Sequence, residues 1–362
     1  WLHNAGFSVG SYTSPHLLQY NERIKLNRKM ASDQDICEAF AAIDSARGDI
    51  LLTYFEFGTL AALWLIQQAR PEFAILEVGL GGRLDAVNII DADMVHLTSI
   101  GLDHQSWLGN DRETIAFEKA GVLREGIPVI CNDIDLPVSV QKEITRLKCR
   151  AEQYQRDFTT RMAENAGQFK WQTDRLEFNL SPVLAGKHQI QNLAGVVAGL
   201  HQLVDLTSFS NEAVQQNFEG ISLPGRFQQI DLGIKAAVYV DVGHNEDAAS
   251  ALAENLSLLK KHEGRIVVLL GMLDDKDNRA FVRGLSHIVD DWWLVSLKSD
   301  RGLPASVLAG RIECEISPGH LFETIDEALD EALSSLGNQD IMLVTGSFLT
   351  IEQCLLALSI KN

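Results

Sequence analysis

Cysteine is scarce in this sequence and never occurs in a paired motif. The five cysteines among 362 residues are Cys37, Cys131, Cys149, Cys314 and Cys354, and no C-x-x-C pair is present. An odd number at wide spacing predicts neither a disulfide framework nor a thiolate zinc site. We therefore expect reduced thiols, most of them buried.

The sequence also has fewer basic than acidic residues, and its apolar runs are short. The net charge is −18, so the long-range field repels polyanions, and we expect neither a nucleic-acid partner nor an anionic membrane partner. The most apolar stretch, Leu60 to Ile66 with its flanks, is far shorter than the about 20 residues of a membrane-spanning helix. With 46% hydrophobic and 22% charged residues, the chain has the composition of a globular enzyme, which we expect to be cytoplasmic.

A phosphate-binding loop of the form G-x-x-x-x-G-K-[ST] is missing. The only Gly-Lys pair, Gly186-Lys187, is followed by His188 and lacks the earlier glycine. The sequence also has no initiator methionine and no leader pattern, and residues 1–7 read as a helix end with a glycine C-cap running into a strand. We expect a further segment before Trp1, and one strand with one helix would be enough to carry the missing loop.

What the sequence does contain is an alternation of short β-branched or aromatic runs with longer amphipathic stretches. This alternation predicts an α/β fold built from mostly parallel sheets. The length suits two domains, and Leu223-Pro224-Gly225-Arg226 marks a boundary that gives domains 1–223 and 224–362. The expected strands are 7–12, 73–78, 94–98, 128–131, a hairpin at 169–172 and 176–180, and then 237–242, 265–270, 292–297 and 340–344. The expected helices are 55–69, 112–122, 190–204, 211–218, 247–261, 279–289 and 325–336.

Polar residues directly after predicted strands are the candidates for chemistry, because ligands bind beyond the carboxyl ends of parallel strands. Ser14, Glu77 and His104 hold such positions in the first domain. Glu77 lies in an apolar run, where a carboxylate is costly unless it is paired or bound to a metal. A hydroxyl and a carboxylate suit magnesium, whereas the imidazole leaves manganese or zinc open.

Other candidates are less specific. The Gly79-x-Gly81-Gly82 run does not meet the G-x-G-x-x-G spacing, so a tight turn is favoured over a dinucleotide site. Lys119 reads locally as a solvated lysine near a helix end. Asp241 ends a strand and is followed by Gly243, His244 and Asn245 before a helix, as in nucleotide-binding turns.

Taken together, these segments resemble the bacterial bifunctional dihydrofolate synthase/folylpolyglutamate synthase family of the Mur ligase superfamily, over essentially the whole length. The resemblance is carried, in chain order, by segments 11–17, 52–56, 76–88, 102–104, 118–121, 223–227, 241–245, 271–272 and 275–277. It implies a P-loop-type domain with a mostly parallel sheet that lacks its first strand and phosphate loop, followed by a smaller Rossmann-like domain.

The same resemblance assigns roles to single residues. It implies magnesium, two ions by family habit, held by Ser14, Glu77 and His104, with a carbamylated Lys119 beside them. For ATP it implies Asn192 on the adenine side, Arg226 at the phosphates, and Asp241 with His244 in the second domain. For the pterin acid it implies contacts at Thr53, Phe55, Leu84, Asp85 and Ala86, and it makes Lys119, His104 and Arg226 the catalytic residues.

The implied reaction is the ATP-dependent joining of L-glutamate to dihydropteroate, and of further glutamates to reduced folates, through an acyl phosphate. The implied partners are therefore these small molecules, and the family habit is a monomer. Two alternatives stay open: a catalytically impaired fragment that binds folate and nucleotide, and a nicotinamide-dependent oxidoreductase that uses Gly79 to Gly82. The retained Glu77, Lys119 and Arg226 favour the ligase.

Overall fold

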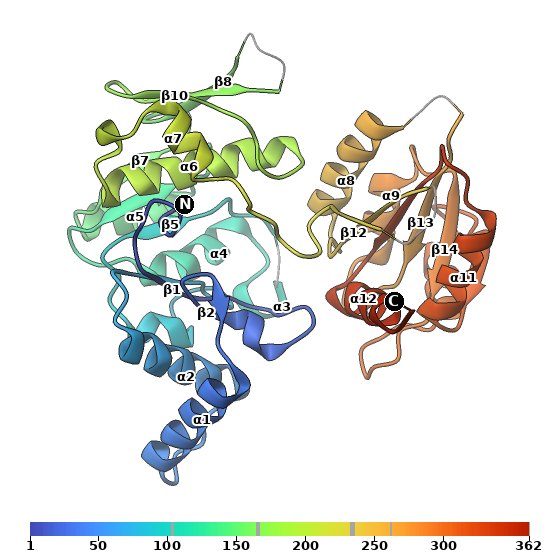
Figure 1. Cartoon of the computed structure of the whole chain (residues 1–362), viewed down its shortest axis with the longest axis horizontal. Coiled ribbons are helices and arrows are strands. Elements are labelled where there is room, and N and C mark those ends of the chain that lie inside the picture. Colours follow the sequence, from blue (N-terminus) through green and yellow to red (C-terminus); the bar gives the residue numbers. More distant parts are fainter. Residues whose placement is uncertain (103–104, 164–166, 232–235, 261–262, 362) are drawn as a thin grey trace. The chain divides into compact units, whose positions relative to one another are not determined.

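The computed structural model describes residues 1–102, 105–163, 167–231, 236–260 and 263–361. The chain forms two compact units, one of residues 1–183 and 188–220 and one of residues 184–187 and 221–362. Figure 1 shows helices and strands alternating along both units. The α/β class predicted from the sequence is confirmed.

The first unit begins with a four-stranded sheet. Its order is β3 (Lys29–Met30), β2 (Ile24–Leu26), β1 (Val9–Tyr12) and β4 (Phe73–Leu76), and only the β1–β4 pair is parallel. The helices α1 (Asp33–Arg47) and α2 (Tyr54–Ala69) pack on each other and share a core with Tyr12 and Ile24. Neither α1, β2 nor β3 was predicted, and β4 forms an edge on which Ala74 and Ile75 are exposed.

A second, fully parallel sheet follows in the same unit. It consists of β5 (Val95–Leu97), β6 (Pro128–Cys131) and β7 (Arg150–Gln153). The remaining elements around it are α3 (Gln105–Leu108), α4 (Arg112–Lys119), η3 (Ala120–Val122), α5 (Val138–Arg146) and α6 (Lys187–Leu203). Gly195 lets α6 lie close to the sheet, since a side chain there would meet His96 and Asn132 at 2.6 to 2.7 Å.

The predicted hairpin is confirmed in a third, antiparallel sheet. Strands β9 (Phe169–Gln172) and β10 (Glu177–Leu180) pair with Trp171 opposite Phe178, and β8 (Thr159–Met162) adds a strand on the other side of β9. Alternate residues Phe169 and Trp171 are buried, as expected for strands with one face toward a core. The short helices η4 (Leu206–Ser208) and α7 (Asn211–Gln216) also belong to this unit.

In its described residues, the second unit is built on one six-stranded sheet. Its order is β11 (Gln228–Ile230), β12 (Ala237–Asp241), β16 (Ile341–Thr345), β13 (Ile266–Leu270), β14 (Asp291–Val295) and β15 (His320–Phe322). All pairs except β11–β12 are parallel. Its helices are α8 (Glu246–Leu259), α9 (Asn278–Leu285), α10 (Ala305–Ile312), α11 (Ile325–Ser335) and α12 (Phe348–Lys361).

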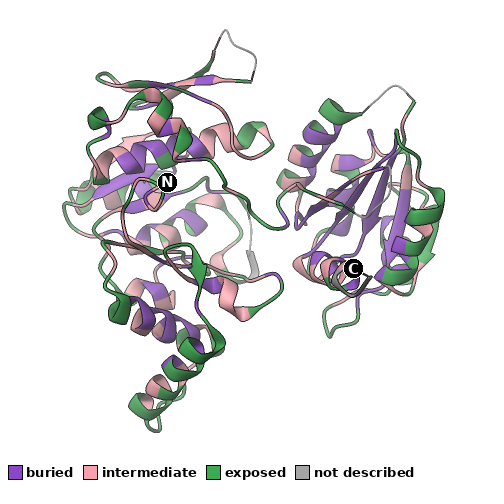
Figure 2. Ribbon diagram, in the orientation of Figure 1, coloured by how far each residue is buried: buried purple, intermediate pink, exposed green. Residues whose placement is uncertain are grey.

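Burial in this unit follows from the parallel topology. Every residue of β13 and β16 is buried, because helices cover both faces of such a sheet. Figure 2 shows these strands buried and the outward helix faces exposed. The sequence predicted the four central strands here but missed β11, β15, α10 and α12.

The structure also bears on the expectations about membrane-spanning helices and about cysteine burial. No helix among the described residues is long and apolar enough to cross a membrane. The expectation that most thiols are buried is wrong, because Cys131 and Cys354 are buried, Cys149 is partly buried, and Cys37 and Cys314 are exposed. Burial raises the pKa of Cys131 and of Cys354 to about 12, so both stay protonated thiols at neutral pH.

Candidate functional site

Two of the predicted metal ligands lie side by side at the ends of neighbouring strands. Tyr12 pairs with Leu76 across β1 and β4, and the Glu77 N–H donates to the Tyr12 carbonyl at 2.9 Å. One step further, the Ser14 N–H donates to Oε2 of Glu77 at 2.9 Å. The parallel register therefore brings a hydroxyl residue and a carboxylate together.

The environment of Glu77 differs from the expectation of a carboxylate enclosed in a strand. Glu77 lies just beyond β4 and is exposed. The reason is that β4 is an edge strand, so its neighbours Ala74 and Ile75 are exposed as well. Because Glu77 is exposed, burial of its charge is no reason to expect a cation there. The position of Glu77 beside Ser14 still favours a metal site.

The third predicted ligand, His104, lies outside the described residues. Within the described ranges there is no group of three or more His, Cys, Asp or Glu side chains arranged to hold a metal. The pair that is present offers oxygen donors, the ligand type that magnesium and manganese prefer. Ser14 and Glu77 thus fit a hard divalent cation as part of a larger ligand set.

The glycine-rich segment after Glu77 turns onto the end of α4. Gly81 and Gly82 both have positive φ, and a side chain at Gly82 would lie 2.9 Å from the Glu118 carbonyl and 3.0 Å from the Lys119 carbonyl. The Arg83 N–H donates to the Glu118 carbonyl at 2.9 Å. The segment therefore does not start a helix as a dinucleotide fingerprint would, and it fixes the turn that carries Lys119.

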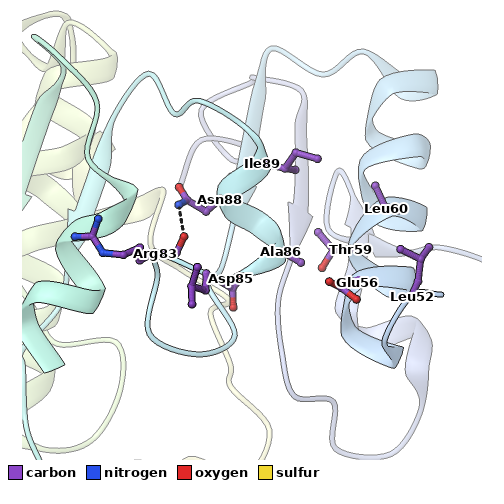
Figure 3. A pocket seen from close by; sticks show the side chains of 10 residues that line it. Leu52, Glu56, Thr59, Leu60, Arg83, Asp85, Ala86, Asn88 and Ile89 are labelled. Carbon is purple, nitrogen blue, oxygen red and sulfur yellow. Dashed lines mark hydrogen bonds between the residues drawn. The ribbon is translucent and has the colours of Figure 1, made fainter. Parts of the chain in front are cut away.

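A pocket of about 380 Å³ opens between α2 and η2 (Ala86–Ile89), as Figure 3 shows. Of the five predicted pterin contacts, Leu84, Asp85 and Ala86 line it, whereas Thr53 and Phe55 do not. The remaining lining residues were not predicted as contacts of the pterin acid: Leu52, Glu56, Thr59, Leu60, Arg83, Asn88 and Ile89. For Glu56, the Thr-x-x-Glu capping pattern was an available signal.

Thr53 and Phe55 have structural partners instead. Thr53 caps α2: its N–H donates to Oε2 of Glu56 at 2.7 Å, and its hydroxyl accepts from the Glu56 N–H at 3.3 Å. The Phe55 ring packs on Gly79, where a side chain would come within 2.8 Å of Cε2. The hydrogen bonds from Thr53 keep the pKa of Glu56 below its ordinary value, so its carboxylate is charged at the pocket.

Asp85 organises the wall of the pocket through its own carboxylate. Oδ2 accepts the N–H groups of Gly79 and Leu80 at 3.0 and 2.9 Å, and Oδ1 accepts the Val87 N–H at 2.9 Å. Both oxygens are therefore engaged by the backbone in this structure. Leu84, which is 92% exposed, supplies apolar surface beside it.

The predicted nucleotide residues of the second unit also converge. Asp241 is buried and accepts the N–H groups of Phe227 and Gly243, each at 2.7 Å. The Val242 N–H donates to the Gly225 carbonyl at 2.9 Å, which joins the Arg226 loop to the end of β12. The Arg226 guanidinium lies 5.8 Å from the ring centre of Phe348, the first residue of α12.

The other two predicted nucleotide residues, His244 and Asn192, each have a neighbour close in sequence. Nδ1 of His244 lies 2.9 Å from the Val242 carbonyl, next to the Asp241 turn. Asn192, on α6 in the first unit, donates to Oε1 of Gln189 at 3.3 Å. Its neighbour Gln191, not singled out from the sequence, ties α6 to the Asn132 carbonyl at 2.5 Å.

Both the fold and the site are those of a two-unit α/β protein with polar residues gathered at the carboxyl ends of parallel strands. Residues 225–348 match the family model described as Mur ligase, glutamate ligase domain. The chain is 37% identical over 347 residues to the dihydrofolate synthase/folylpolyglutamate synthase of Escherichia coli, covering 96% of this chain and 79% of that protein. On this evidence the chain belongs to the dihydrofolate synthase/folylpolyglutamate synthase family.

Solved structures agree with this assignment. The Escherichia coli protein in complex with DHPP and ADP superposes with a TM-score of 0.90 at 35% identity, covering 99% of this chain and 84% of that one. A bifunctional folylpolyglutamate synthase/dihydrofolate synthase from Yersinia pestis, complexed with AMPPNP and manganese, gives a TM-score of 0.87 at 37% identity with the same coverage.

Proposed function

We propose that this chain is an ATP-dependent ligase that joins L-glutamate to dihydropteroate and adds further glutamates to reduced folates. The observation that carries the proposal is the segment from Glu77 to Ile89. It begins at the carboxylate beside Ser14, passes over the turn that carries Lys119, and ends as one wall of the pocket. One continuous segment thus serves the metal pair, the lysine and the substrate site.

The chemistry needs a carboxylate to attack a phosphate, so two anions must approach each other. A divalent metal, when bound by Ser14, Glu77 and further ligands, supplies positive charge that offsets this repulsion. Lys119 at the end of α4 is proposed to carry a carbamate beside the metal. Arg226 is proposed to contact the phosphates, with Asn192, Asp241 and His244 holding the rest of the nucleotide.

In the substrate pocket, this chain's own residues bind and orient the pterin acid. The pocket combines apolar surface from Leu52, Leu84 and Ile89 with the charged carboxylate of Glu56. A flat heterocycle with polar edges suits such a lining. The Phe55 ring packs on Gly79, whose N–H donates to the carboxylate of Asp85 in the pocket wall.

Relatives support the choice of ligands. One solved relative is a complex with DHPP and ADP, and another is a complex with AMPPNP and manganese. The family model that matches residues 225–348 is described as a glutamate ligase domain. The monomeric state, the cytoplasmic location, the number of metal ions and the domain limits 1–223 and 224–362 remain predictions.

The direct test is glutamate-dependent ADP release by the purified chain with ATP, magnesium and dihydropteroate. We expect a product heavier than dihydropteroate by one glutamyl residue, seen by mass spectrometry. Omitting glutamate should abolish both the product and the ADP. ADP release that is independent of glutamate and of dihydropteroate would contradict the proposal, and binding of both ligands without a product would identify a binding fragment.

A further inference from the structure

Arg83 is one of the residues that line the pocket, but its guanidinium contacts Phe117 on α4. Figure 3 shows the guanidinium directed away from the groove between α2 and η2, toward α4. Its Nη2 donates to the Phe117 carbonyl at 3.1 Å, and its centre lies 4.0 Å from the centre of the Phe117 ring. Its Nε lies 3.8 Å from Oε1 of Glu118.

These contacts all fall on the last turn of α4, the turn that ends at Lys119. A cation at a helix C-terminus is favourable, because the last carbonyls lack partners within the helix and carry partial negative charge. The Arg83 guanidinium supplies that cation at Phe117, and the Arg83 N–H satisfies the next carbonyl, that of Glu118, at 2.9 Å. One residue thus caps two successive carbonyls before Lys119.

Glycines make this approach close on both sides. A side chain at Gly121 would lie 2.5 Å from Cα of Arg83, and one at Gly82 would meet the Glu118 and Lys119 carbonyls. Asn88, which also lines the pocket, donates both to the Arg83 carbonyl at 3.0 Å and to the Gly121 carbonyl at 3.2 Å. The pocket wall and the α4–η3 junction therefore pack as one body.

We propose that Arg83 is a positioning residue that fixes the direction of Lys119 and joins the substrate pocket to it. The inference rests on the proposed function, in which Lys119 acts beside the metal. Arg83 does not touch the substrate in this account, because its guanidinium is directed onto α4. Its replacement should therefore misplace the lysine without removing a substrate contact.

Arg124 provides a matched control in the same corner of the fold. Its side chain is 28% exposed, against 35% for Arg83. It donates to Asn88 at 2.9 Å and to the Gly121 carbonyl at 3.4 Å and pairs with Asp91, and these partners all lie outside α4. Arg124→Gln should therefore destabilise the corner while leaving Lys119 in place.

The kinetic test compares Arg83→Gln with Arg124→Gln in glutamate-dependent ADP release, at a temperature where both are folded by circular dichroism. For Arg83→Gln we expect kcat to fall by about 10- to 100-fold with the KM for dihydropteroate nearly unchanged, since small misplacements of reacting groups cost this much. Arg83→Lys should recover part of kcat and serves as the second variant if the glutamine fails to fold. Equal kcat losses in the Arg83→Gln and Arg124→Gln proteins, or a rise in KM alone, would overturn the proposal.

A second readout does not depend on turnover. An amine-acylating reagent followed by peptide mass spectrometry gives the labelling rate of Lys119 relative to the exposed Lys142. We expect this ratio to rise several-fold in Arg83→Gln and to stay at the wild-type value in Arg124→Gln. Identical ratios in all three proteins would refute the role of Arg83, whereas an inactive wild type with a changed ratio would refute the proposed function and leave the role of Arg83 standing.

Discussion

The backbone N–H of Ser14 donates a 2.9 Å hydrogen bond to Oε2 of Glu77. The two residues are 63 positions apart in the sequence, and they meet because β1 and β4 are parallel neighbours in register. The chain then runs from Glu77 through the glycines to the pocket wall. This order of residues places a candidate metal pair and a substrate site on one short segment.

Replacement of Glu77 by glutamine should remove ligation while keeping the fold. The side chain is exposed, so its exchange should leave the melting temperature within about 2 °C of wild type. Loss of the charge should lower turnover at moderate magnesium by about 100-fold. Steady-state ADP release against magnesium concentration measures this, and near-normal turnover would show that Glu77 holds no metal.

Lys119→Ala should be inactive for a different reason, the loss of the proposed carbamate. Added formate or acetate should restore part of the activity, because a small carboxylate can occupy the position of the missing group. Lys142→Ala, an exposed lysine on α5, is the control and should retain wild-type rates. Full activity of Lys119→Ala without any additive would contradict the assignment.

Asp85→Asn should weaken the pocket wall. The amide retains one acceptor oxygen but turns a donor toward the N–H groups of Gly79, Leu80 or Val87, and an unsatisfied group of this kind costs about 1–3 kcal/mol. We expect a lower urea midpoint together with a raised KM for dihydropteroate. If KM rises while the unfolding midpoint is unchanged, Asp85 contacts the substrate directly and its structural role is secondary.

His96 should make the first unit less stable in mild acid. Its Nε2 is shielded from solvent and has no hydrogen-bond partner among the described residues, and burial lowers the pKa of the ring to about 4 from 6.5. Between these values the unfolded chain binds a proton that the folded chain does not. Stability is therefore fully present above pH 6.5 and falls as the pH drops toward 4, by about 3 kcal/mol in all.

The variant His96→Asn isolates this contribution. His96 on β5 faces α6, and two other titratable groups lie on the elements nearby: Glu152 on β7, whose pKa is raised by burial, and His201 on α6. Both are present in wild type and variant, so the difference between the two proteins reports His96 alone. Urea midpoints at pH 7, 6 and 5 should converge as the pH falls, and a constant difference would contradict the shifted pKa.

The sequence predicted what depends on local pattern. Two short runs on either side of a turn located β9 and β10. Apolar runs located the central strands of the second unit, because those strands are buried on both faces. Short elements such as β2, β3 and β15 carried too little pattern to be recognised. The amphipathic signal of α1 was missed because most of that helix is exposed and only Ile36 and Ala39 are buried.

The sequence predicted those candidate site residues that directly follow strands. The structure places Ser14 next to Glu77, as their positions after strands indicate, and their role as metal ligands stays a prediction. The exposure of Glu77 depends on which strand lies at the edge, and sequence pattern does not give strand order. The orientation of Arg83 depends on Gly82 and Gly121, which are 39 positions apart and allow two backbones to touch. Such long-range contacts leave no periodic trace in the chain.

The most direct test of the central claim follows oxygen from the carboxylate of the pterin acid. Dihydropteroate labelled with ¹⁸O in its carboxylate is incubated with the chain, ATP, magnesium and L-glutamate, and the inorganic phosphate is analysed by mass spectrometry. Activation of the carboxylate by phosphorylation predicts one ¹⁸O atom transferred to phosphate for each amide formed. Amide formation with unlabelled phosphate would contradict the account.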